Sequence, residues 1–130
     1  MVDDVAYMKR AIALAKSHAE VHALNQSGDN AKGATLYVTL EPCSHYGKTP
    51  PCALRIIEEG IAKVVIGSTD PNPLVAGKGI ELLKEAGIEV VVPVCSDECA
   101  ELNEHFFTYI QTGKPFVTIK SAMSLDGKIA

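Results

Sequence analysis

The chain has 130 residues, with 12 Lys and Arg against 16 Asp and Glu, four cysteines and 47% hydrophobic residues. This length and composition are typical of one globular domain and exclude a disordered chain. The net charge of −4 disfavours a nucleic-acid-binding module, because such modules carry basic surfaces. No apolar run reaches the ~18–20 residues of a membrane-spanning helix, and the acidic, amphipathic start is not typical of a signal peptide. We therefore expect a cytoplasmic domain that binds neither membranes nor nucleic acid, with cysteines that are reduced thiols or metal ligands.

Hydrophobic periodicity and turn-forming residues predict helices and strands that alternate along the chain. Asp3 and Asp4 are positioned to cap the first helix. In the first half of the chain we expect a helix from 4 to about 15, a helical segment at 18–24, a strand at 34–40, a loop at 41–51 and a helix at 52–59. In the second half we expect a strand at 63–67, a helix at 79–86, a strand at 88–94, a helix from 96 to about 112, a strand at 115–120 and a turn at 124–127. Ser96 is expected to cap the helix that it begins. Strands without polar alternation, separated by single helices, indicate an α/β fold whose sheet is covered on both faces.

Four residues predict a metal centre: His18 and Glu20 as His-x-Glu, Cys43 after a proline, and Cys52. A hydrolytic zinc site needs three protein ligands and an open position, which one imidazole and two thiolates can supply. Cys52 follows two prolines at an expected helix start, where its thiolate is favoured. Glu20 is suited to proton transfer rather than to ligation. The alternative is two free thiols and a solvated histidine, because isolated matches of this size are weak.

Other polar residues are candidates for substrate binding. In the loop after Cys43, His45 can hydrogen-bond an oxygen atom of a ligand and Lys48 can pair with a phosphate, although loops are polar by default. Asp70 and Asn72 follow a strand end, where open α/β sheets bind ligands, but Asp-Pro-Asn-Pro also forms turns regardless of function.

The remaining thiols and aromatic residues near the C-terminus are expected to pack. Cys95 and Cys99 are interpreted as packing thiols rather than as a second metal site. The last helix is expected to pack through three neighbouring rings, those of His105, Phe106 and Phe107.

The motif H-x-E followed by P-C-x-x-C is typical of zinc nucleobase deaminases, but here the second cysteine lies nine positions after the first. The string TLEPCSHYGKTPPC with this longer spacing resembles the bifunctional deaminase–reductase family of riboflavin biosynthesis. Residues 34–59, 70–79 and 120–129 resemble that family in the same order, so the resemblance covers essentially the whole chain. It implies a three-layer α/β/α sandwich of the cytidine-deaminase-like type.

The resemblance also implies a chemistry. Zinc would be bound by His18, Cys43 and Cys52, and Glu20 would donate and accept the proton. The reaction would be hydrolytic deamination of a small molecule, 2,5-diamino-6-ribosylamino-4(3H)-pyrimidinone 5′-phosphate, in a protein that forms a homo-oligomer. Two alternatives are a catalytically compromised zinc-binding or assembly module and another zinc deaminase acting on a nucleoside or tRNA.

The sequence departs from this family at two places. In the family, a segment with two strands separates the first helix from the His-x-Glu helix, whereas Ser17 here directly precedes His18. We therefore expect a deaminase domain over 1–112 that lacks two N-terminal strands. Residues 113–130 resemble the linker and first strand of the reductase domain, in which Ala122 would touch the nicotinamide cofactor. NADPH binding needs a complete reductase domain, so reductase activity is not expected from this chain.

Overall fold

The computed structural model describes residues 3–14, 19–47 and 50–129, apart from the side chains of residues 14 and 19–22. The elements along these residues are α1 (Asp4–Leu14), α2 (Ala19–Ser27), the 3-10 helix η1 (Gly28–Ala31), β1 (Thr35–Leu40), α3 (Cys52–Glu58), β2 (Lys63–Ser68), α4 (Lys78–Glu85), β3 (Glu89–Val91), α5 (Ser96–Leu102) and α6 (Glu104–Thr112). None of the described helices is long and apolar enough to cross a membrane.

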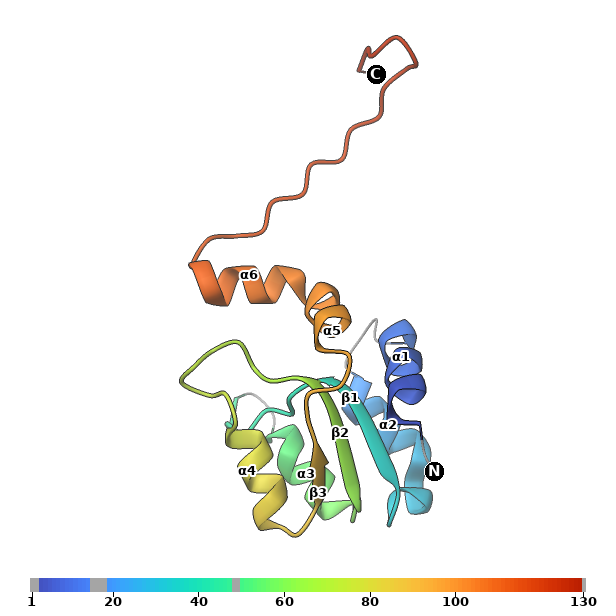
Figure 1. Cartoon of the computed structure of the whole chain (residues 1–130), viewed down its shortest axis with the longest axis vertical. Helices are drawn as coiled ribbons and strands as arrows, with labels where there is room; N and C mark the ends of the chain where they lie inside the picture. Colours follow the sequence, from blue (N-terminus) through green and yellow to red (C-terminus); the bar gives the residue numbers. More distant parts are fainter. Residues whose placement is uncertain (1–2, 15–18, 48–49, 130) are drawn as a thin grey trace.

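The three strands form a parallel sheet in the order β1-β2-β3 (Figure 1). Tyr37 of β1 is in register with Val65 of β2, which is in register with Val91 of β3. Parallel neighbours need a crossover connection, and α3 and α4 provide the two crossovers. The predicted α/β class is confirmed.

Both faces of the sheet are covered by helices, because successive side chains of β2 point to opposite sides. Val64 and Ile66 belong to the larger core, which also contains residues of α2, α3 and α4. Val65 lies on the other face with Met8 of α1 and Cys99 of α5. The domain is therefore a three-layer sandwich, with α2, α3 and α4 on one side and α1 and α5 on the other (Figure 1).

The helix expected at 96–112 is two helices, and that expectation was wrong. The chain breaks at Asn103, whose backbone is outside the helical region and whose side-chain Nδ2 donates to the Cys99 carbonyl at 3.0 Å. An asparagine side chain that bonds to the backbone competes with the regular helix. Ser96 is the first residue of α5 rather than its cap, since Cys95 occupies the cap position with a left-handed backbone.

Two strand predictions also differ from the structure. β3 ends at Val91, and Pro93, which has no N–H to donate to a sheet, follows shortly after it. The expected strand at 115–120 is not formed, because this segment leaves the body of the domain and lies beside no other strand (Figure 1). The expected turn at 124–127 is present, with the Gly127 N–H donating to the Ser124 carbonyl at 2.9 Å.

The aromatic residues of the last helix pack against neighbouring rings, but outside the core of the domain. α6 contains no buried residue, and Phe106 is 40% exposed. His105 contacts the ring of Phe116 with 4.5 Å between centroids, and Phe106 contacts Phe107 edge-on. These rings touch one another or the following segment instead of filling the core.

Candidate metal centre and its adjoining loop

The structure brings Cys43 and Cys52 together at the start of α3. The Cys52 N–H donates to Cys43 Sγ at 3.1 Å, and the Ala53 N–H donates to the Cys43 carbonyl at 3.2 Å. Pro42 and Pro51, which precede the two cysteines, are fully buried, whereas Cys43 itself is exposed. Two cysteines that are nine positions apart in the sequence are therefore in direct contact, through the backbone N–H of Cys52 and the sulfur of Cys43.

This arrangement suits a thiolate–metal centre. Cysteine sulfur binds zinc as the thiolate, and the sulfur of Cys43 lies at the solvent-exposed start of α3. The two thiols thus fit a zinc ion with cysteine ligands. Among the described residues, no three His, Cys, Asp or Glu side chains come together around one point. The third predicted ligand, His18, lies outside those residues.

α2, which contains Glu20, lies beside α3 on the same face of the sheet. The two helices are joined by Arg55, whose Nη2 donates to Asn25 Oδ1 at 3.1 Å. Arg55 also forms an ion pair with Glu59 of its own helix, with 2.8 Å between Nε and Oε1. The helix that begins with Cys52 and the helix that follows His18 are therefore direct neighbours, although the Glu20 side chain is among those not described.

Glu41 is a functional candidate that the sequence reasoning missed. Its side chain is only 6% exposed. Oε2 accepts hydrogen bonds from the backbone N–H groups of Asp70 at 3.0 Å and Gly77 at 3.1 Å, and Oε1 accepts one from Ile80 at 3.3 Å. The sequence signal that could have identified Glu41 is its position, directly between an expected strand and the Pro-Cys pair. An acidic residue that is buried at such a position needs several hydrogen-bond donors around its carboxylate.

Asp70 and Asn72 use their side chains for local turns. Asp70 Oδ1 accepts from the Asn72 N–H at 2.8 Å, and Asn72 Oδ1 accepts from the Leu74 N–H at 3.0 Å. These bonds are typical of Asx turns, which was the structural alternative for both residues. Both residues are partly exposed and so remain accessible to a ligand. Their role in substrate binding remains a prediction.

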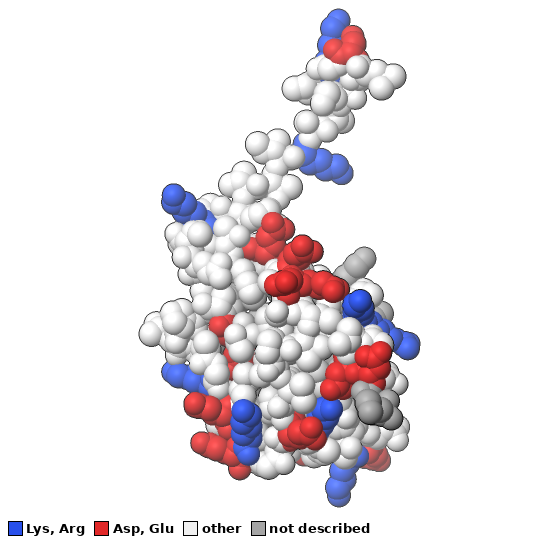
Figure 2. Space-filling model, viewed as in Figure 1, with Lys and Arg blue, Asp and Glu red and all other residues white. Residues whose placement is uncertain are grey.

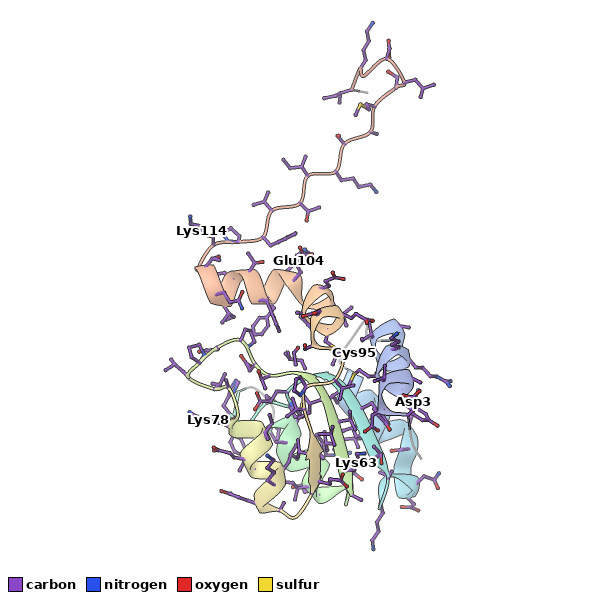
Figure 3. All side chains as sticks on the ribbon, in the orientation of Figure 1. Asp3, Lys63, Lys78, Cys95, Glu104 and Lys114 are labelled. Carbon is purple, nitrogen blue, oxygen red and sulfur yellow. The ribbon has the colours of Figure 1, made fainter. Side chains whose placement is uncertain are left out.

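The other predicted residues are spread along the chain. His45 is exposed in the loop after Cys43, and Lys48 lies outside the described residues. Ala122 is exposed in the segment that leaves the body of the domain (Figure 1). The side-chain view in Figure 3 shows Lys114 at the beginning of that segment and Lys78 at the start of α4, on separate parts of the molecule.

The charge on the visible face does not suit nucleic acid. In Figure 2, acidic side chains gather over α5, whereas Lys and Arg are scattered. α5 carries Asp97 and Glu98 in its first turn, and Glu104 begins α6. This face therefore lacks the basic patch that RNA or DNA binding requires.

The chain belongs to the cytidine and deoxycytidylate deaminase family, whose zinc-binding region matches residues 2–68. Within that class, it is similar to the riboflavin biosynthesis protein RibD. It is 62% identical to RibD of Aquifex aeolicus over 115 residues, which cover 88% of this chain and 32% of the relative. The chain therefore spans about a third of the length of this curated relative.

A solved structure supports the same similarity at the level of the fold. The diaminohydroxyphosphoribosylaminopyrimidine deaminase/5-amino-6-(5-phosphoribosylamino)uracil reductase of Thermotoga maritima matches with a TM-score of 0.79 and 41% identity, covering 98% of this chain and 46% of that chain. The predicted family resemblance and the cytidine-deaminase-like fold are confirmed.

One relative aligns over more residues than this chain contains. RibD of Actinobacillus pleuropneumoniae is 46% identical over 160 aligned residues, which cover 98% of this chain and 43% of the relative. Because this alignment is longer than the chain of 130 residues, the relative carries residues that have no counterpart here. In this chain α1 ends at Leu14 and α2 begins at Ala19.

Proposed function

We propose that this domain catalyses the zinc-dependent hydrolytic deamination of 2,5-diamino-6-ribosylamino-4(3H)-pyrimidinone 5′-phosphate. The observation that carries the proposal is the meeting of Cys43 and Cys52 at the start of α3, within a domain of a zinc-binding deaminase family. The similarity to RibD proteins supports the substrate, since the Thermotoga relative is described as a deaminase of this pyrimidine class.

His18, Cys43 and Cys52 would hold the metal. Zinc, when bound, supplies Lewis-acid activation of water at neutral pH. Glu20 would take one proton from the attacking water and give it to the ring nitrogen, and would then move the remaining hydroxyl proton to the departing amino group. A C–O bond forms at the ring carbon, the C–N bond breaks, and the products are the ring carbonyl compound and ammonia.

Substrate binding is assigned to the two loops beside Cys43. His45 and Lys48 would contact the pyrimidine or the phosphate, whose negative charge matches a lysine. Asp70 and Asn72 would contribute through the adjoining loop, where Glu41 fixes the Asp70 backbone. A second copy of the chain is the expected partner, because in the described part of the sheet β1 pairs on one side only, and an open edge favours self-association.

The domain boundary is placed at 1–112 for the deaminase and 113–130 for the linker and opening strand of a reductase domain. Residues 111–129 are all exposed, which supports a segment that does not belong to the deaminase core. Ala122 would touch NADPH only within a complete reductase domain.

Glu20→Gln separates catalysis from metal binding. We expect this variant to keep its zinc, measured by elemental analysis, and to lose about 10²- to 10⁴-fold in ammonia release from the pyrimidine ribotide. Cys43→Ser should instead lose zinc and activity together, and Cys99→Ser, which changes a thiol outside the centre, should lose neither.

The same assay decides between the alternatives. Turnover by Glu20→Gln at a rate near that of the wild type would refute the role of Glu20. Zinc binding without ammonia release by the wild type would favour a catalytically compromised module. Faster deamination of cytidine than of the ribotide would favour a nucleoside deaminase.

A further inference from the structure

We propose that Glu41 is a positioning residue for Cys43, and that its buried carboxylate locks the Pro42–Cys43 segment onto the loop after β2 and the first turn of α4. This inference rests on the proposed function in one respect, the role of Cys43 as a metal ligand. It adds a residue outside the predicted ligands that sets how rigidly one ligand is held.

Glu41 is anchored to the sheet through its backbone. Its N–H donates to the Ser68 carbonyl at 2.9 Å, which extends the pairing of β1 and β2 by one step. The side chain then crosses to the chain segment that follows β2. There it accepts the backbone N–H groups of Asp70, Gly77 and Ile80. One carboxylate thus joins the end of β1 to both ends of the 70–77 loop.

The carboxylate also caps α4 from a distance. Gly77 is the N-cap residue of α4 and has no side chain to bond the free N–H groups of the first turn. Glu41 Oε1 bonds the N–H of Ile80, the third residue of the helix, as an N-cap side chain would do. A negative group at this end of the helix is also favoured by the helix dipole.

Gly79 shows how closely α4 approaches the metal-ligand segment. A Cβ at position 79 would lie 2.1 Å from the Pro42 carbonyl oxygen and 3.4 Å from Glu41 Cγ. The first turn of α4 therefore rests directly on the residue before Cys43. Cys43 is held from α3 by the N–H groups of Cys52 and Ala53, and from α4 through Pro42 and Glu41.

Removing the carboxylate breaks the hydrogen bonds from Glu41 to the 70–77 loop and α4. The hydrogen bonds from the start of α3 to Cys43 remain. The larger core does not depend on Glu41, because Val64, Ile66 and Leu83 are buried apolar residues that pack without it. We therefore expect the domain to remain folded while Cys43 becomes less well oriented. Residues that orient a ligand from outside the metal typically change metal affinity about 10- to 100-fold.

The test compares zinc affinity in the full chain, measured by competition with a chromophoric chelator. Glu41→Ala is expected to bind zinc about 10- to 100-fold more weakly than the wild type, and its cobalt-substituted form to show altered ligand-field absorption. Glu41→Gln should lie in between, because its carbonyl can serve the N–H groups of Asp70 and Gly77 while its amide NH₂ then faces the Ile80 N–H. Glu81→Gln, the same change at an exposed position of α4, should behave as wild type.

Amide hydrogen exchange makes the structural consequence visible independently of the metal. In Glu41→Ala the amides of Asp70, Gly77 and Ile80 should exchange faster, and in Glu41→Gln that of Ile80 should, while the amides of β2 stay protected in both variants. If these amides lose protection and zinc affinity is unchanged, Glu41 has a structural role only and the proposal is overturned. Unchanged exchange overturns it as well. If Glu41→Ala does not fold, Glu41→Gln decides by the same two measurements.

Failure of the proposed function gives a different result. If neither the wild type nor Glu81→Gln binds zinc, the metal centre is refuted and the positioning role with it. If both bind zinc tightly and Glu41→Ala does too, only the positioning role is refuted.

Discussion

At the scale of single residues, Gly67 in β2 is the glycine outside the candidate metal centre that leaves the least room for a side chain. A Cβ there would lie 2.2 Å from Cys99 Sγ and 2.7 Å from the Thr39 carbonyl oxygen. Cys99 is fully buried, and burial raises the pKa of its thiol to about 11, with the charges of Cys95 and Glu98 adding to the effect. Cys99 is therefore a protonated packing thiol at neutral pH, as its sequence context predicted.

Gly67→Ala should be strongly destabilising, because the new methyl group collides with a backbone oxygen as well as with a side chain. We expect a loss of about 2–3 kcal/mol in the free energy of unfolding, measured with urea. Gly47→Ala is the matched control, since nothing lies within 4 Å of its Cβ position.

The double variant Gly67→Ala/Cys99→Ala tests the geometric reason. It removes the contact with sulfur but keeps the contact with the Thr39 oxygen, so it should recover only part of the loss. A stability of Gly67→Ala within about 0.5 kcal/mol of the wild type would refute the close packing of α5 on the sheet.

At the scale of elements, α1 is joined to the sheet by a polar cluster. Asp4 Oδ2 lies 3.1 Å from Lys63 Nζ, and the Tyr37 hydroxyl donates to Asp4 Oδ1 at 2.9 Å. The bond from Lys63, followed by that from Tyr37, lowers the pKa of Asp4. Burial, and then the bond to Asp4, raises the pKa of Tyr37 to about 12. Asp4 thus fastens the helix to two strands, and its neighbour Asp3 caps the helix by accepting the Ala6 N–H.

Tyr37→Phe should reduce stability in a pH-dependent way. The pKa of Tyr37 is higher in the folded chain than its usual value of 10, so its contribution is fully present below pH 10 and is lost as the pH rises to about 12. We expect the wild type to exceed the variant by about 1–2 kcal/mol at pH 7, and this margin to shrink between pH 10 and 12. Urea unfolding of both proteins between pH 7 and pH 12 measures this difference in the free energy of unfolding.

Tyr109→Phe, on the exposed helix α6, provides the comparison for this experiment. It should change neither the stability at pH 7 nor its decline at high pH. A margin for Tyr37→Phe that stays constant from pH 7 to pH 12 would contradict the assigned bond to Asp4.

At the scale of the whole molecule, the sandwich and the segment after α6 are separate parts of the structure. Residues 111–129 are exposed throughout, and the segment extends away from the domain (Figure 1). Several of its exposed side chains are apolar, among them Val117, Ile119 and Leu125. The sandwich, by contrast, buries its apolar residues on both faces of the sheet.

A chain shortened to end at Thr112 should therefore fold and bind zinc like the longer one. We expect its free energy of unfolding to differ by less than about 0.5 kcal/mol, because tolerance to truncation follows burial. A chain ending at Val94 is the control. It lacks α5 and Cys99, leaves Met8 and Val65 uncovered, and should be clearly less stable. Failure of the chain ending at Thr112 to fold would place the domain boundary elsewhere.

Prediction from sequence succeeded where the physical signal is local. β1, α3, β2 and α4 lie within a residue or two of their expected bounds, because apolar periodicity and flanking glycines or prolines mark such elements. It failed at Asn103 and at 115–120. The helix break at Asn103 depends on a side chain that bonds back to the helix backbone. A strand at 115–120 depends on a neighbouring strand with which it can pair.

The sequence by itself determined the fold class, the order of the three strands with the two helices that connect them, and the pair of cysteines that bracket one loop. These follow from residue type and spacing, which act over a few neighbouring positions. Only the tertiary structure decided that Cys43 and Cys52 meet, that Glu41 joins β1 to α4, and that Gly67 makes room for Cys99. These contacts join residues from 9 to 39 positions apart, and only the packing of helices on both faces of the sheet brings them into hydrogen-bonding or van der Waals range.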